Sequence, residues 1–249
     1  MRLPDRFLAR PIAHRALHGE GRVENSIAAI EAAIARDFPI EIDVQLTSDD
    51  EAVVFHDYDL RRLTPEMGPL RQRSAAQLRT MPYMAGPGTI PLLSEVLELI
   101  AGRVPLVVEI KDQDGALGAD VGRLEAAVAR ATEGYDGDLA FMSFNPHSVW
   151  EMKRLCPDVA RGLVTDTFDK DDWPVPQPTL ERLREIPDYD HVGASFISHR
   201  ASDLSRPRVT DLKNEGAVIL CWTIKTAEDE AAAREIADNV TFEGYDPDA

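Results

Sequence analysis

The chain has few cysteines and no long apolar run, and each shortage excludes a class of protein. Cys156 and Cys221 lie far apart and form no metal-ligand spacing, so we expect buried, reduced thiols rather than a disulfide framework. No stretch approaches the ~18 apolar residues of a membrane span. Residues 1–10 carry three arginines and no apolar core, unlike a secretory signal. These absences predict a soluble, cytoplasmic protein.

Positive charge is also scarce. Twenty-seven Lys and Arg residues stand against 44 Asp and Glu residues, which gives a formal net charge of -17. Such a charge repels nucleic acids and anionic membrane surfaces, so neither is expected as a partner. A small-molecule substrate that carries phosphate would need local cations. The composition does not indicate an oligomeric state.

The densest group of chemical side chains is residues 40–57, IEIDVQLTSDDEAVVFHD. Two runs of strand-forming residues flank a polar turn, which predicts an antiparallel ribbon. Glu41 and Asp43 are two positions apart, so they point to the same face of an extended strand. A turn centred at 49–50, between the two aspartates, places His56 opposite Asp43. Two acids and an imidazole then share one small volume.

Carboxylates this close repel one another unless a cation lies between them. Carboxylate oxygens are ligands that Mg²⁺ and Ca²⁺ prefer, so the pattern predicts a divalent metal at Glu41 and Asp43. The alternative is an ordinary solvated face of a strand. A further acid, Glu109, lies in the apolar run VPLVVEI at 104–110 and needs a partner there. Lys111 faces the same side and permits an internal ion pair.

Strands and helices alternate along the whole chain. Apolar residues repeat at helical spacing between the apolar runs, and residues 61–84 form an irregular, polar excursion. This alternation and the length of ~250 residues predict one α/β domain over 1–249. We expect a TIM-type (β/α)8 barrel, distorted around the ribbon of the second and third strands. The expected strands are 11–13, 40–47, 52–55, 104–110, 139–144, 161–165, 191–197 and 217–224.

Barrel enzymes carry their chemistry at the carboxyl ends of the strands. Several polar and aromatic residues fall at or near such ends in this assignment, which favours a site over a solvated strand face. They are His14, Arg15, Glu41, Asp43, Glu109, Lys111, Ser143 and Trp222.

With these residues in place, the chain resembles the glycerophosphodiester phosphodiesterase family, whose fold is the phospholipase C-like phosphodiesterase barrel. The similar segments run in family order across most of the chain. They are Ala13-His14-Arg15, Glu24-Asn25-Ser26, Glu41-Ile42-Asp43-Val44, Val54-Phe55-His56-Asp57, Pro91-Leu92-Leu93-Ser94-Glu95, Glu109-Ile110-Lys111, Ser143-Phe144 and Trp222-Thr223-Ile224.

The resemblance implies hydrolysis of glycerophosphodiesters to sn-glycerol 3-phosphate and an alcohol, with a divalent metal (Mg²⁺ or Ca²⁺) as cofactor. It also implies a role for each matching residue: His14 and His56 as the acid/base pair, Glu41, Asp43 and Glu109 as metal ligands, Arg15 and Lys111 as phosphate ligands, and Trp222 against the glycerol. These residue types suit the reaction. Histidines near neutral pKa exchange protons, while a metal and an arginine fork offset the charge of the phosphate.

Three departures from the family pattern leave the alcohol of the substrate open. Ala16 stands where glycine usually follows His-Arg, and an unusual His18 comes soon after it. Lys225 stands where asparagine is common, and residues 238–243 only weakly match the closing motif of the family. Two other readings therefore stay open. One is phosphodiesterase chemistry of the lysophospholipase D or cyclic-phosphate-forming kind, and the other is a catalytically silent barrel that binds a phosphorylated metabolite.

Overall fold

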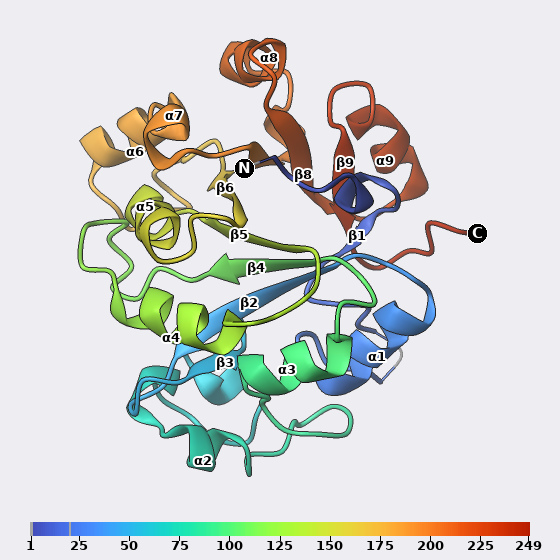
Figure 1. The fold of residues 1–249 in the computed structure, drawn as a ribbon, viewed down its shortest axis with the longest axis vertical. Coiled ribbons are helices and arrows are strands. Elements are labelled where there is room, and N and C mark those ends of the chain that lie inside the picture. Colours follow the sequence, from blue (N-terminus) through green and yellow to red (C-terminus); the bar gives the residue numbers. More distant parts are fainter. Residues whose placement is uncertain (1, 20) are drawn as a thin grey trace.

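The predicted closed barrel is present in the computed structural model, which describes residues 2–19 and 21–249 (Figure 1). Eight parallel strands of this described part form the ring, and the pairing of β1 with both β2 and β9 closes it. In ring order they are β1 (Ile12–Ala13), β2 (Ile40–Leu46), β4 (Leu106–Ile110), β5 (Leu139–Ser143), β6 (Ala160–Thr165), β7 (Phe196–Arg200), β8 (Val218–Ile224) and β9 (Asn239–Phe242).

Helices cover the outside of the ring, as Figure 1 shows for α1, α3, α4 and α5. Ser26 begins the first of them, because its side chain accepts a hydrogen bond from the backbone N–H of Ala29 at 3.2 Å. The helices are α1 (Ile27–Ala35), α2 (Ala75–Leu78), α3 (Leu93–Ile100), α4 (Arg123–Thr132), α5 (Pro146–Leu155), α6 (Gln177–Arg184), α7 (Tyr189–Val192), α8 (Pro207–Asn214) and α9 (Ala227–Ala233).

Strand alternation decides which side chains enter the barrel. Ile40, Ile42 and Val44 of β2 pack in the core between the ring and the helices. The residues between them, Glu41 and Asp43, therefore face the interior. The interior also holds a separate apolar cluster that includes Val107, Met142, Val164, Phe196 and Leu220. The two acids thus enter the barrel close to hydrophobic side chains.

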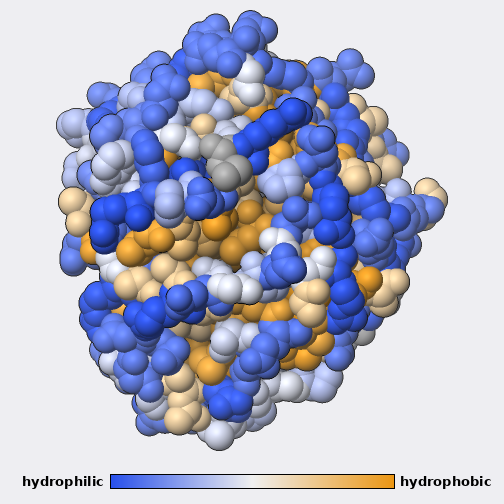
Figure 2. All heavy atoms as spheres, viewed as in Figure 1, coloured by the Kyte–Doolittle hydropathy of each residue, from blue (hydrophilic) through white to orange (hydrophobic). Residues whose placement is uncertain are grey.

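The outer surface is mostly hydrophilic, as expected from the many charged residues of the sequence. Hydrophilic residues cover most of the face seen in Figure 2, and hydrophobic residues show in a band across its middle, at the level of β4 and β5. No helix in the described part of the chain has both the length and the apolar character needed to cross a lipid bilayer.

Two strand assignments from the sequence were wrong. The segment expected as the third barrel strand is β3 (Ala52–Val54), which pairs only with β2, in antiparallel fashion, and lies outside the ring. The eighth ring strand is instead β9. It begins with the buried polar residue Asn239, so it lacks the continuous apolar run by which the other strands were predicted. That side chain donates hydrogen bonds to the carbonyl oxygens of Phe7 and Arg10, both at 2.7 Å. The polar strand therefore serves to anchor the amino-terminal arm.

The register of the ribbon also differs from the expectation by one residue. Val44 pairs with Val54, so the turn is centred on Asp49 and Asp43 lies opposite Phe55 rather than His56. The cause is the turn itself, in which Asp50 adopts the left-handed conformation with φ of 61°. A three-residue hairpin loop ends on such a residue, whereas the predicted centre requires an even loop.

One local boundary was wrong as well. Residues 191–192 belong to α7, which ends at Gly193 with φ of 64°, so β7 begins only at Phe196. The cap residue of α3 is Leu92, whose backbone N–H donates to Oε2 of Glu95 at 2.9 Å.

His199, on β7, is fully buried. Its Nδ1 lies 2.7 Å from Oγ1 of Thr165, and its Nε2 faces Asp203, with Arg206 next to that acid. Burial lowers the pKa of His199, although Asp203 partly offsets this. The unfolded chain therefore binds a proton from pH ~6.5 downward, before the folded state does.

We expect the free energy of unfolding to decrease as the pH falls from ~6.5 through the folded-state pKa of His199. The His199→Gln variant should lose this part of the pH dependence. Urea unfolding of parent and variant across pH 4.5–8 measures it, and equal pH slopes would contradict the assignment.

Candidate active site

The predicted site residues converge on one small cavity at the carboxyl ends of the strands. Its volume is about 70 Å³. Of the predicted residues, Asp43 and Ser143 do not line it: both are buried, and the hydroxyl of Ser143 donates to the carbonyl of Ile110 at 2.7 Å. The lining residues are His14, Arg15, Glu41, His56, Glu109, Lys111, Met142, Phe144, Val164, Ser198, Trp222 and Thr241.

Three buried acids form the floor of this site. Asp43 and Glu109 are direct partners in the register of β2 and β4, and Glu41 lies two residues before Asp43. One oxygen from each of the three lies within 4.8 Å of the others. Burial and the charges of Asp43 and Glu109 raise the pKa of Glu41 well above its usual value.

The donor set fits a divalent metal ion. Oε1 of Glu41 is buried and has no hydrogen-bond partner among the described residues. An unsatisfied carboxylate oxygen in the protein interior is costly, and a cation would satisfy it. All three candidate ligands, Glu41, Asp43 and Glu109, are carboxylates, which suit hard ions such as Mg²⁺ and Ca²⁺.

Two cations border the acids. Nζ of Lys111 lies 2.7 Å from Oε1 of Glu109 and 3.3 Å from Oδ1 of Asp43, so the predicted ion pair is confirmed and belongs to the site. Burial alone would lower the pKa of Lys111, but the two acids raise it above its usual value. Arg15 donates from Nη1 to Oε1 of Glu24 at 2.8 Å, and its Nε lies 3.5 Å from Oδ2 of Asp43.

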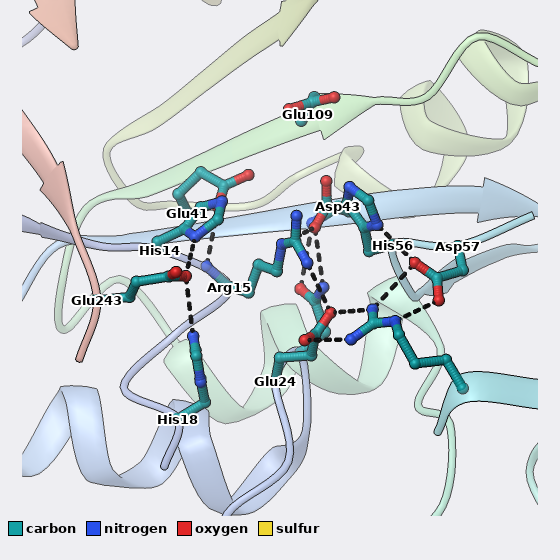
Figure 3. A network of polar contacts seen from close by, with 12 residues as sticks. His14, Arg15, His18, Glu24, Glu41, Asp43, His56, Asp57, Glu109 and Glu243 are labelled. Carbon is teal, nitrogen blue, oxygen red and sulfur yellow. Dashed lines mark hydrogen bonds and ion pairs between the residues drawn. The ribbon is translucent and has the colours of Figure 1, made fainter. Parts of the chain in front are cut away.

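His14 follows β1 and is fixed from both sides. Its backbone N–H donates to the carbonyl of Phe242 on β9, at 3.0 Å. Its Nδ1 lies 2.6 Å from Oε2 of Glu243, which leaves Nε2 as the other reactive nitrogen (Figure 3). Burial lowers the pKa of His14, although the Glu243 hydrogen bond acts against this. The lowered pKa favours the neutral form of the imidazole.

His56 has the same kind of support from a different element. Its Nδ1 lies 2.7 Å from Oδ1 of Asp57, and its carbonyl accepts from Gln45 at 2.9 Å. Asp57 in turn accepts from Nε of Arg62 at 2.6 Å. Burial would raise the pKa of Asp57, but its hydrogen bonds with His56 and Arg62 hold it below its usual value. Each of the two histidines thus presents one ring nitrogen to a carboxylate (Figure 3).

Sequence reasoning missed the residues that support the site. Asn25 donates from Nδ2 to Oδ2 of Asp43 at 2.9 Å, and Glu24 bridges Arg15 and Arg62. Asn25 and Asp57 lie inside segments that the sequence analysis named, so a signal was available for both. Glu243 also lies in a named segment, 238–243, but its pairing with His14 gave no local signal, because the two residues are 229 positions apart in the chain.

Trp222 lines the small cavity and also two larger ones. Its Nε1 donates to the carbonyl of Ser198 at 3.0 Å, and its ring packs edge-on against Phe144. One of the larger cavities is mostly apolar and has a volume of about 690 Å³, and the other is more polar and has a volume of about 870 Å³. Trp173, from the loop at 166–176, lines both of these larger cavities.

The chain is similar in sequence to a known protein family and to several characterised proteins. The model of the glycerophosphoryl diester phosphodiesterase family matches residues 14–242. A glycerophosphodiester phosphodiesterase of Caldanaerobacter subterraneus is 26% identical over 227 residues, which cover 88% of this chain and 86% of that protein. Lysophospholipase D GDPD1 of Rattus norvegicus is 33% identical over 130 residues, which cover 47% of this chain and 40% of that protein.

A solved structure agrees with the family match. A phosphodiesterase of Oleispira antarctica, in complex with the product sn-glycerol-3-phosphate, is 26% identical, with a TM-score of 0.79. The superposition covers 97% of this chain and 95% of that one. The chain therefore belongs to the glycerophosphoryl diester phosphodiesterase family of phosphoric diester hydrolases.

Proposed function

We propose that this protein is a metal-dependent glycerophosphodiesterase, which hydrolyses a glycerophosphodiester to sn-glycerol 3-phosphate and an alcohol. One observation carries the proposal. Two histidines, each with Nδ1 held by a carboxylate, border the same small cavity as two buried acids, Glu41 and Glu109, and two cations, and the third acid, Asp43, is buried close to those two. The complex of the Oleispira phosphodiesterase with sn-glycerol-3-phosphate supports the choice of product.

In the proposed reaction His14 and His56 move the protons. One accepts the proton of the attacking oxygen, and the other donates a proton to the oxygen of the leaving alcohol. Glu41, Asp43 and Glu109 would hold Mg²⁺ or Ca²⁺, which supplies positive charge to the phosphate when bound. Arg15 and Lys111 add cationic donors to the nonbridging oxygens, and Trp222 packs against the glycerol.

The direct test is an assay of purified protein on a panel of glycerophosphodiesters, with Mg²⁺ or Ca²⁺ present. Glycerophosphocholine and glycerophosphoethanolamine represent small polar alcohols, and ³¹P NMR identifies the phosphorus product. We expect sn-glycerol 3-phosphate and free alcohol. Folded protein that turns over no diester would contradict the proposal and favour a silent barrel, and a cyclic phosphate as the final product would change the reaction class.

A second candidate, lysophospholipase D-like cleavage of lysolipids, is favoured by the apolar cavity beside His56. Leu117, Phe144, Trp173 and Trp222 line it together with Pro174. An acyl chain attached to the glycerol would bury apolar surface there, at roughly 25 cal/mol per Å². Including lysophosphatidylcholine in the substrate panel distinguishes the glycerophosphodiesterase function from the lysophospholipase D-like function. A higher kcat/KM for the lysolipid than for glycerophosphocholine assigns the lysolipid reaction.

A protein with a net charge of -17 needs a local cation to bind an anionic phosphate, and we expect Arg15 to be that cation. Lysine at this position keeps the charge but loses the planar fork that holds two phosphate oxygens. We expect Arg15→Lys to reduce kcat/KM at least about tenfold, or ~1.4 kcal/mol. Moderate salt should weaken substrate binding little, because buried contacts are poorly screened.

Steady-state kinetics across a salt series measures the effect. Arg154→Lys serves as the control, since Arg154 is exposed and pairs only with Glu151 among the described residues. An unchanged kcat/KM in Arg15→Lys would assign the phosphate contact to Lys111 instead.

A further inference from the structure

We propose that His14, His18 and Glu243 form a second metal site, of a type that binds zinc, and that a metal ion bound there inhibits the enzyme. Oε2 of Glu243 lies 2.6 Å from Nδ1 of His14 and 3.5 Å from Nε2 of His18. One ligand atom from each of the three residues lies within 4.8 Å of the others. Figure 3 shows both imidazoles directed toward the Glu243 carboxylate from opposite sides.

The state of His18 is a second observation. Its Nε2 is buried, and it lies 3.5 Å from Oε2 of Glu243, where the geometry of a hydrogen bond is not met. A buried ring nitrogen without a hydrogen bond loses its hydration without recovering that energy. Metal coordination would satisfy it. His18 is also one of the positions at which the sequence departs from the pattern of its family.

The donor set selects a different metal from the one expected at the three acids. Two imidazole nitrogens and one carboxylate oxygen, with a fourth position open, form a set that zinc takes in proteins. With Zn–N and Zn–O distances of ~2.0–2.2 Å, tetrahedral ligand atoms lie ~3.3–3.5 Å apart. Closing the site around zinc therefore needs a shift of about 0.8 Å between Glu243 and His14, almost none between Glu243 and His18, and at most about 1.5 Å between the two histidine nitrogens. The all-oxygen cluster of Glu41, Asp43 and Glu109 suits harder ions.

Lys225 is the competitor of such a metal ion. Its Nζ lies 2.8 Å from Oε1 of Glu243, the oxygen that does not face the histidines. The lysine side chain is 65% exposed, so it can turn into solvent when a second cation arrives. A divalent ion and the ammonium group repel each other at this separation. Lys225 should therefore weaken zinc binding without being a ligand.

The inhibitory consequence rests on the proposed function of His14. A metal ion on Nδ1 of His14 leaves the proton on Nε2, so the ring can no longer accept a proton there. Glu243 would at the same time exchange its hydrogen bond with His14 for a bond to the metal. Zinc at this site should lower the rate without displacing the ion at Glu41, Asp43 and Glu109.

Zinc binding is tested first, by isothermal titration with ZnCl₂, because it needs no activity. The protein is the Glu41→Gln/Asp43→Asn variant, and the parent saturated with Mg²⁺ is a second sample in case the variant does not fold. We expect one Zn²⁺ per chain. His18→Gln should weaken binding at least tenfold, Lys225→Met should strengthen it, and X-ray absorption should report two histidine nitrogens.

His147→Gln and Lys213→Met are the matched controls, since they remove a histidine and a lysine elsewhere on the surface. Both should bind zinc as the parent does. The absence of zinc binding, or an equal affinity of the parent and the His18→Gln variant for zinc, would contradict the proposed second metal site.

Inhibition is tested second, with each rate normalised to that of the same variant without zinc. We expect ZnCl₂ to inhibit the parent at saturating Mg²⁺, and the half-inhibitory concentration to rise at least tenfold in His18→Gln. Inhibition that excess Mg²⁺ relieves, or that His18→Gln leaves unchanged, would mean displacement at the acid cluster and would overturn the inhibitory role. If no diester is turned over at all, the proposed function fails while the binding experiment still decides the site.

Discussion

Replacement of either His14 or His56 by alanine should reduce kcat by ~10²- to 10⁴-fold, the usual contribution of general acid or base catalysis. Both side chains border the cavity, and both have Nδ1 on a carboxylate, so each is fixed in a tautomer that can exchange a proton through Nε2. The fold should survive, because neither residue belongs to the apolar clusters that support the barrel.

Steady-state kinetics and thermal unfolding of the two variants measure these effects. His147→Ala is the matched control, since His147 is exposed, and it should keep the parental rate. A rate within a few-fold of the parent in a folded His14→Ala or His56→Ala protein would remove that histidine from the proposed mechanism.

Loss of the metal should abolish turnover to a similar extent. A bound divalent ion stabilises the transition state by several kcal/mol, so we expect a fall of at least about a hundredfold after exhaustive chelation. Re-addition of Mg²⁺ or Ca²⁺ should restore the rate in the parent. It should not restore it in Glu41→Gln/Asp43→Asn, because two of the three oxygen ligands of the cluster are then changed.

The control for this experiment removes the same number of charges elsewhere. Asp120→Asn/Glu133→Gln changes two exposed acids and should behave as the parent does, with and without chelator. Full turnover by the chelated parent would contradict a metal at this cluster. It would also mean that Lys111 and Arg15 alone offset the charge of the phosphate.

Much of the site was readable in the sequence because its residues lie in local patterns. Glu41 and Asp43 share a face through the two-residue period of a strand, and Glu109 with Lys111 repeats that spacing on another strand. Alternating strands and helices then bring the carboxyl ends of parallel strands to one side. The structure gathers these residues in one place, as the patterns predicted.

Other features depend on contacts between distant segments, which no local pattern contains. The ring closes on β9 instead of β3, since a hairpin partner can pair outside the ring as easily as inside it, and the expected apolar signal is absent from Asn239–Phe242. The register of the ribbon followed from the conformation of Asp50, which a hydrophobic pattern does not determine.

The sequence by itself determined the barrel class and the strand faces that carry the acids, because both follow from periods of a few residues. Only the tertiary structure placed Glu243 against His14 and His18, and Lys225 against Glu243. The physical reason is that the closing strand β9 ends beside the first strand of the ring. Barrel closure thereby joins the two ends of the chain, and a carboxylate near the carboxyl terminus becomes the partner of the first histidine.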